Sequence, residues 1–159
     1  MLVDSMEKIP KILMKTNRGE IIIRLSPEFA PETVANFLIL VEKGFYNGLL
    51  FHSVIPNFIV QGGDPLTRDP SKREKWGTGG SGYKVKNETE GNSLKFKPGA
   101  ISMVHMDKNI GSSQFFIALT RVSTKHLDGL YTIFGHVVKG MDIVNKIQQE
   151  DKIIEITVI

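Results

Sequence analysis

The stretch FHSVIPNFIVQGGD, which runs from Phe51 to Asp64, decides how the rest of the chain is interpreted. It predicts a strand, a turn at Pro56, a second strand and an exit through two glycines. Most of it is apolar, but four polar residues interrupt the run: His52, Ser53, Gln61 and Asp64. A buried strand pair whose polar groups face one cavity would have this pattern. A core hairpin whose polar groups bond to the backbone would have it too, so the stretch alone leaves both interpretations open.

The bulk composition is that of an ordinary globular domain. The chain has 159 residues, of which 41% are hydrophobic and 23% are charged. A formal net charge of +3 is too small to indicate nucleic-acid binding. The absence of cysteine excludes disulfides and cysteine-based metal sites. We expect a single domain over residues 1–159, with a flexible N-terminal extension at 1–8, in a soluble, cytoplasmic and monomeric protein that binds no membrane.

Periodicity along the chain predicts about eight strands, besides a short edge strand over 94–96, and two helices. The strands are expected over residues 9–16, 20–25, 49–55, 58–60, 94–96, 100–106, 113–119, 131–138 and 152–159, and the second helix over 141–148. The first helix should begin at Pro31 and end at Gly44, with Val34, Phe37, Leu38 and Val41 on its apolar face. Strands do not alternate with helices, which argues against a doubly wound parallel sheet. Short strands that must hide their edges favour a closed β-barrel whose ends the helices cover.

Other sequence motifs do not indicate nucleotide binding, metal binding or hydrolysis. GTGGSG at 77–82 fits the G-x-G-x-x-G pattern, but no strand precedes it and no helix follows it, so we interpret it as part of a flexible loop over 65–83. The four histidines lack the spacing of metal ligands, and we expect no metal site. Ser113 does not lie in a nucleophile elbow. The pair His126 and Asp128 fits a turn better than a catalytic dyad.

Strand parity gives one positive indication of a binding pocket. In the strand over 113–119, residues 114, 116 and 118 share one face, so Gln114 and Phe116 point the same way. Phe58, Ile59 and Gln61 offer a similar mixture on the first element. An apolar pocket with a few amide donors suits a proline ring and the peptide carbonyl beside it.

Five blocks in order resemble a cyclophilin: FHSVIPNFIVQGGD (51–64), GTGG (77–80), PGAISM (98–103), GSSQFFI (111–117) and HLDGLYTIFG (126–135). The resemblance covers the chain from about residue 11 to its end. It implies a mainly β fold, a closed eight-stranded antiparallel barrel capped by two α-helices. It also implies a peptidyl-prolyl cis–trans isomerase that assists protein folding, acts on proline-containing peptides and flexible protein segments, and needs no cofactor.

The resemblance also implies a role for individual residues. The proline ring would bind in a socket of Phe58, Ile59, Phe116 and Leu127, with His126 and Tyr131 at its rim. Gln61 would bind a substrate carbonyl, and His105 would bind the peptide through its backbone. Val104, Met106 and Gln114 would line the groove for the residues before the proline. With the residue at position 53, Phe58, Gln61 and Phe116 would form the catalytic set.

The departure that matters is Ser53, because the family normally has an arginine there as the donor beside the proline nitrogen. Serine cannot give the forked, charge-assisted bonds of a guanidinium. Losing one preorganised donor of this kind costs roughly 10²–10³ in rate. Arg68, Arg73 or Arg121 could replace it from a loop. The open hypotheses are an isomerase with reduced activity, a proline-peptide binding module with little catalysis, and a structural barrel with an unused pocket.

Two further departures concern ligands. Met106 is bulkier than the small residue usual at its position, and it would narrow the groove. His126 stands where many relatives have tryptophan, although histidine also occurs there. We therefore expect cyclosporin to bind only weakly.

Overall fold

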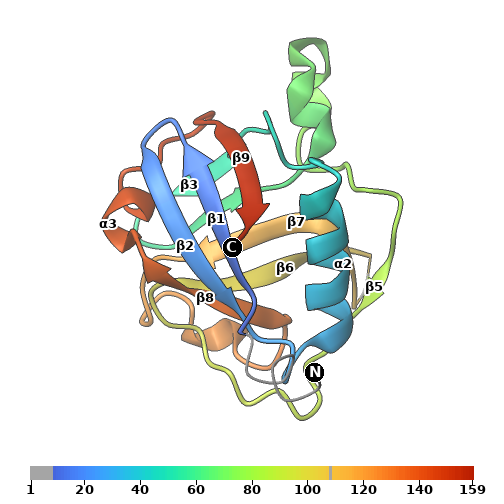
Figure 1. Ribbon diagram of the computed structural model, residues 1–159, viewed down its shortest axis with the longest axis vertical. Helices are drawn as coiled ribbons and strands as arrows, with labels where there is room; N and C mark the ends of the chain where they lie inside the picture. The colour runs from blue at the N-terminus through green and yellow to red at the C-terminus, as the bar shows by residue number, and fades with distance from the viewer. Residues whose placement is uncertain (1–8, 108) are drawn as a thin grey trace.

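The computed structural model describes residues 9–107 and 109–159. One strongly curved antiparallel sheet wraps around an apolar core, and a long helix packs along its side (Figure 1). The strands are β1 (Lys11–Thr16), β2 (Gly19–Leu25), β3 (Ser53–Ile55), β4 (Ile59–Gly62), β5 (Val85–Lys86), β6 (Ala100–Asp107), β7 (Ile110–Ala118), β8 (Ile133–Lys139) and β9 (Ile153–Val158). The helices are α2 (Pro31–Glu42) and α3 (Met141–Val144), with short 3-10 helices η1 (Pro65–Arg68), η2 (Pro70–Lys75) and η3 (Lys125–Leu127).

The strands bond in the order β3-β4-β7-β6-β8-β2-β1-β9, and β5 pairs with the start of β7. Every pairing is antiparallel. The mainly β, antiparallel class predicted from the sequence is confirmed, but the closed barrel is wrong. Within the described residues, β3 and β9 form no ladder. The chain segments that precede them, residues 48–51 and 150–153, meet in a short seam with one bridge, Leu50 to Lys152.

The seam is short because the chain turns just before β9. Glu150 has a φ of 71°, and the Asp151 amide donates to the Gln148 carbonyl at 2.9 Å. Phe51 then exchanges two backbone hydrogen bonds of 2.8 Å with residues 150 and 151. The strand predicted over 49–55 is shortened to β3, because the backbone of residues 48–51 bonds to residues 150–153 in this seam.

The concave side of the sheet is filled by apolar side chains. Alternate residues of β1 and β2 point inward, and Ile12, Met14, Ile21 and Ile23 are fully buried. At the centre, the ring of Phe37 lies 5.1 Å from that of Tyr46 and 6.1 Å from that of Phe115. The Tyr46 hydroxyl donates to the Ser113 carbonyl at 2.8 Å. Burial raises the pKa of Tyr46, so its phenol remains a donor.

Helix α2 follows its predicted limits. Pro31 occupies the first turn, and Gly44, with a φ of 70°, follows Lys43, the C-terminal cap residue of the helix. The backbone amide of Thr33 donates to the Glu88 carboxylate at 2.7 Å, so an acidic side chain from a distant loop satisfies the helix N-terminus. Phe37 and its neighbours on one face reach the core, whereas Ile39 is exposed.

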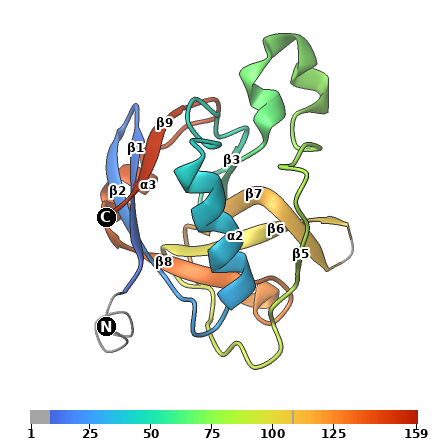
Figure 2. The same cartoon turned by 45° about the vertical axis from the view of Figure 1, so that its right-hand side comes forward.

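Three other elements differ from the sequence prediction. The helix predicted over 141–148 ends at Val144, although Ile147 is still buried. Residues 94–96 form no strand, because the Phe96 amide donates to the Asp128 carboxylate at 2.8 Å instead of to a neighbouring strand. The loop over 65–83 contains η1 and η2, which stand out from the sheet as an arm (Figure 2). No helix in the described ranges is long and apolar enough to cross a membrane.

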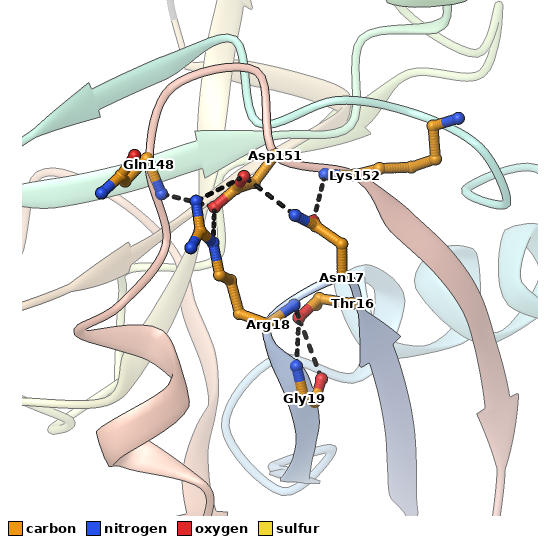
Figure 3. Close-up of polar contacts among 7 residues, drawn as sticks. All are labelled: Thr16, Asn17, Arg18, Gly19, Gln148, Asp151 and Lys152. Carbon is orange, nitrogen blue, oxygen red and sulfur yellow. Dashed lines mark hydrogen bonds and ion pairs between the residues drawn. The ribbon is translucent and has the colours of Figure 1, made fainter.

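A polar junction at Asp151 ties the first hairpin to the turn before β9 (Figure 3). The Asp151 carboxylate accepts hydrogen bonds from Arg18 at 2.7 Å, from the Asn17 side chain at 3.0 Å and from the Gln148 amide at 2.7 Å. The Asn17 side chain in turn accepts from the Lys152 amide at 2.7 Å. Burial raises the pKa of Asp151, but these hydrogen bonds and the Arg18 charge outweigh it and lower the pKa below its ordinary value. The carboxylate is therefore ionised in the folded protein at neutral pH.

We predict that Asp151→Asn lowers the free energy of unfolding by about 1–3 kcal/mol at pH 7, since charge-assisted hydrogen bonds are lost. A lowered folded-state pKa stabilises the fold above the ordinary aspartate pKa of about 4 and stops doing so as the pH falls through the lowered value. The difference between the two proteins should therefore shrink toward zero in acid. Urea unfolding across this pH range measures it.

The matched control is Asp142→Asn, which changes an exposed carboxylate of α3. It should leave stability within about 0.5 kcal/mol of the parent. Equal losses in both variants, or a loss at Asp151 that does not change with pH, would contradict the role of the junction.

Candidate functional site

The register of the sheet aligns three of the predicted site residues. Ser53 of β3 lies directly opposite Gln61 of β4, and Gln61 lies directly opposite Phe116 of β7. Residues opposite one another in an antiparallel sheet project from the same face. Ser53, Gln61 and Phe116 therefore form one row across three strands, which we call the site row.

The site row lies on the outer face of β7. Phe115 and Ile117 point into the central core, whereas Phe116 and Ala118 belong to a second apolar cluster. Gln114 precedes Phe116 by two residues and shares its face. The prediction that residues 114, 116 and 118 share a face is confirmed.

The second cluster gathers the residues of the predicted proline socket. Ile59 and Phe116 are buried in it, and the half-buried side chains that pack against it include Phe58, Val104, Leu127 and Tyr131. The Phe116 ring stacks on Phe96 at 5.5 Å and meets the edge of Tyr131 at 5.9 Å. Exposed His126 stacks on Phe58 with ring centres 6.3 Å apart. The structure thus brings all the predicted socket residues to one partly open apolar surface.

A chain of hydrogen bonds fixes the amide of Gln61. Its Nε2 donates to Gln114 Oε1 at 3.0 Å, and Gln114 Nε2 donates to the Gly79 carbonyl at 2.8 Å. Gln61 Nε2 also lies 3.5 Å from His52 Nε2. Burial lowers the pKa of His52, with the Asp64 charge opposing it, so the ring is neutral at pH 7 and can accept. Gln61 thus has one firm anchor and one long contact.

Asp64 fixes the position of Gly79, where this series of hydrogen bonds ends. Its fully buried carboxylate accepts backbone hydrogen bonds from Leu66 at 2.8 Å, Gly77 at 2.6 Å and Gly79 at 3.1 Å. A Cβ at Gly79 would collide with this carboxylate, and one at Gly80 would lie 2.7 Å from Ser112 Oγ. The sequence pattern predicts a flexible loop here, but Gly79 and Gly80 are required because their backbone lies too close to Asp64 and Ser112 for a larger side chain. Asp64 was not among the predicted site residues, and in the sequence it is marked only as an acid directly after two glycines.

The groove expected beside the socket lies at the end of β6. Val104, His105 and Met106 are half-buried there, and a cavity of about 170 Å³ borders Met106, Thr78 and Ser112. The His105 ring packs 4.5 Å from Tyr131, and its Nε2 lies 3.3 Å from the Asn87 side-chain oxygen. Burial lowers the pKa of His105, so this ring too is neutral at pH 7. Met106 Sδ lies 3.5 Å from Gln114 Nε2, which places it against the fixed amide chain.

Ser53 is half-buried, and its hydroxyl has no hydrogen-bond partner among the described residues. The three arginines considered as substitutes bind elsewhere. Arg68 donates to the carbonyls of residues 45 and 47, and Arg73 pairs with Glu150 at 2.6 Å. Arg121 pairs with Asp128 at 2.7 Å. In the described parts of the chain, no group of three or more potential ligand residues could hold a metal ion.

We predict that Asp64→Asn will move the side-chain amide NMR signals of Gln114 and Gln61. Both carboxylate oxygens of Asp64 accept hydrogen bonds, whereas asparagine has one accepting oxygen and an NH₂ group that can only donate. The backbone signals of Gly77 and Gly79 should move as well. A two-dimensional ¹H–¹⁵N spectrum of the labelled protein gives this readout.

Asp69→Asn is the matched control, because Asp69 caps η2 by accepting from Ser71 at 2.9 Å and bonds to nothing in the amide chain. It should change signals in the arm only. If the Gln61 signal moves equally in both variants, or in neither, Asp64 does not position Gln61.

Comparison with known proteins identifies the family. Residues 11–157 match the family described as cyclophilin type peptidyl-prolyl cis-trans isomerase/CLD. The chain is 45% identical to a Bacillus subtilis protein named peptidyl-prolyl cis-trans isomerase B, over 88% of this chain and 91% of that one. It is 41% identical to a Helicobacter pylori peptidyl-prolyl cis-trans isomerase, over 93% of this chain and 86% of that one.

Solved structures agree with this match. A Cryptosporidium parvum cyclophilin type peptidyl-prolyl cis-trans isomerase superposes with a TM-score of 0.81 at 28% identity, covering 96% of this chain and 98% of that one. A second crystal structure of that protein, obtained in the presence of the dipeptide Ala-Pro, has a TM-score of 0.80, covering 94% and 98%. The chain therefore belongs to the cyclophilin family and is a peptidyl-prolyl cis–trans isomerase.

Proposed function

We propose that the site row is where this isomerase rotates X-Pro bonds in peptides and flexible protein segments, and that Ser53 makes the reaction slow. The observation that carries the proposal is the register, which sets Ser53, Gln61 and Phe116 side by side with Gln61 anchored to Gln114. The crystal structure obtained in the presence of Ala-Pro supports a proline peptide as the ligand.

The reaction needs no acid, base or bond cleavage. Rotation about an X-Pro bond must break amide resonance, against a barrier of about 18–20 kcal/mol. The protein accelerates it by binding the twisted amide more tightly than the planar one. Three kinds of contact can do this: an apolar grip on the proline ring, donors that hold the neighbouring carbonyls, and a donor to the proline nitrogen.

The socket supplies the first contact. Phe58, Ile59, Phe116 and Leu127 offer a preformed apolar surface, with His126 and Tyr131 at its edge. A proline ring that packs there loses water from its whole apolar face. Because Phe116 is held between Phe96 and Tyr131, the socket fixes the ring while the residue before it turns.

Gln61 supplies the second contact. Its firm bond to Gln114 sets the plane of the amide, and its long contact to His52 can be exchanged for a bond to a substrate carbonyl. The backbone of His105 would hold the peptide on the other side. The half-exposed surface of Val104 and Met106, with Gln114 beneath it, would receive the residues before the proline.

The third contact is the one that Ser53 weakens. When resonance is lost, the proline nitrogen regains a lone pair that a charged donor stabilises. The serine hydroxyl is short and neutral, and the three candidate arginines are engaged with other partners. We therefore propose reduced activity. The same observations favour a second candidate function, a proline-peptide binding module in which the socket binds and little rotation follows.

We predict that Ser53→Arg raises the rate of isomerisation by roughly 10²–10³, as expected for one restored preorganised donor. NMR exchange spectroscopy on a short Ala-Pro peptide measures the rate directly and needs no coupling protease. Peptide affinity should change much less than rate, because the added donor acts in the twisted state.

Ser53→Lys is the matched control, since it adds the same charge without the planar fork. It should restore less of the rate than arginine does. A native protein that is already fast, and that gains little from arginine, would show that another group serves the proline nitrogen. A native rate equal to the uncatalysed one, with intact peptide binding, would favour the binding module.

We also predict that cyclosporin binds weakly, with a dissociation constant in the micromolar range or higher. His126 presents a smaller ring than tryptophan and no indole N–H in that position. His126→Trp should tighten binding about tenfold, as measured by isothermal titration calorimetry. A sub-micromolar constant for the native protein would contradict this expectation.

A further inference from the structure

We propose that this cyclophilin has a second binding site, outside the site row, which takes a phosphate group carried on a small apolar molecule. The site is a cavity of about 390 Å³ beside β2 and β8, which lie next to each other in the sheet (Figure 1). Its lining combines the cationic side chains of Arg24, Lys95 and Lys97 and the imidazole of His136 with the apolar side chains of Leu94, Ala100 and Ile133.

The sheet register concentrates basic residues at this place. Lys11, Arg24 and His136 lie directly opposite one another on β1, β2 and β8. Their side chains share the outer face, because the intervening residues Ile23 and Leu25 are fully buried in the core. Lys11 and Arg24 are like charges, and like charges directly opposite in a sheet destabilise it. A bound anion would remove this repulsion.

Arg24 is the strongest indication of a ligand. Its Nε is buried, yet it has no hydrogen-bond partner, and no ion pair of Arg24 occurs within the described residues. A buried donor on a charged group normally has a partner, since leaving it unpaired is costly. A phosphate oxygen in the cavity would satisfy it with a charge-assisted bond.

The surrounding charges keep the cavity positive. Burial lowers the pKa of His136, and the positive charges of Lys97 and Arg24 lower it further, while Glu28 opposes them. Glu28 lines the same cavity, but it forms no ion pair with any described residue. The cations outnumber this one carboxylate. A phosphate monoester carries about −1.5 to −2 at pH 7, which matches the excess better than a single carboxylate does.

The remaining lining indicates what the phosphate is attached to. Leu94, Ala100 and Ile133 form an apolar side of the cavity, and they belong to the same cluster that contains Phe116. Ala100 and Ile133 are already buried, so Leu94 supplies the exposed part of this side. A bare phosphate would leave Leu94 exposed to water, whereas a phosphate on an aromatic or aliphatic body would cover it. The inference does not depend on the proposed role of Ser53, because no residue of the site row lines the cavity.

Phenyl phosphate is the probe for the test, with inorganic phosphate and phenol as its two halves, all at one ionic strength. NMR titration of the full chain should show saturable shifts at residues 24, 97 and 136 with phenyl phosphate. Each half should bind at least several-fold more weakly. Absence of saturable shifts with phenyl phosphate would overturn the proposal, and equal binding of inorganic phosphate would overturn the apolar body.

Variants test which residues bind the anion. Arg24→Gln should weaken phenyl phosphate at least tenfold, and Lys97→Gln, in an exposed loop, should weaken it several-fold. Lys139→Gln is the control, because Lys139 is an exposed cation on β8 that does not line the cavity. Unchanged affinity in Lys97→Gln, or equal losses in Lys97→Gln and Lys139→Gln, would overturn the site even if Arg24→Gln failed to fold. Isomerisation should be unchanged in Lys97→Gln, which separates this result from the catalytic proposal.

Discussion

Strand β7 is buried on both of its faces, and most of the structure depends on that constraint. Phe115 and Ile117 close the central core, while Gln114 and Phe116 support the site on the opposite side. Because alternate residues of a strand are committed to opposite faces, neither face can shift without the other. The socket is therefore as rigid as the core beneath it. A catalyst that must distinguish a twisted amide from a planar one needs such a rigid surface.

The polar part of the site is rigid for a different reason. Asp64 has no solvent contact, so its charge is balanced by backbone N–H groups that must approach very closely. Only glycine leaves room for that approach at position 79. The result is a glycine-rich segment that is ordered by a carboxylate and that delivers its own carbonyl to Gln114. The arm formed by η1 and η2 lies in the sequence between Asp64 and Gly77 (Figure 2). The hydrogen bonds from Gly77 and Gly79 to the Asp64 carboxylate form across the base of this arm.

The sequence predicted those features that depend on neighbouring residues. Pro31 and Gly44 bound α2 by their own backbone preferences, and alternation placed Gln114 and Phe116 on one face. The family resemblance named the remaining socket residues, which the fold brings together. Local patterns could not predict that the barrel stays open. That outcome depends on a turn at Glu150 and on the contact of this turn with a segment about a hundred residues away. For the same reason they could not show that a candidate arginine such as Arg73 is held by a distant partner, Glu150.

The pairing of β1 with β9 has a consequence for how this protein is made. Leu13 lies opposite Thr157, so β1 cannot complete its pairing until β9 has been synthesised. Until then β1 has an open edge, and Asn17 and Arg18 lack the carboxylate that orders their turn. Such long-range pairing slows folding and leaves unpaired edges exposed meanwhile. The first hairpin of this isomerase therefore keeps one strand edge unpaired, and its turn without the ordering carboxylate, until β9 and Asp151 have been synthesised.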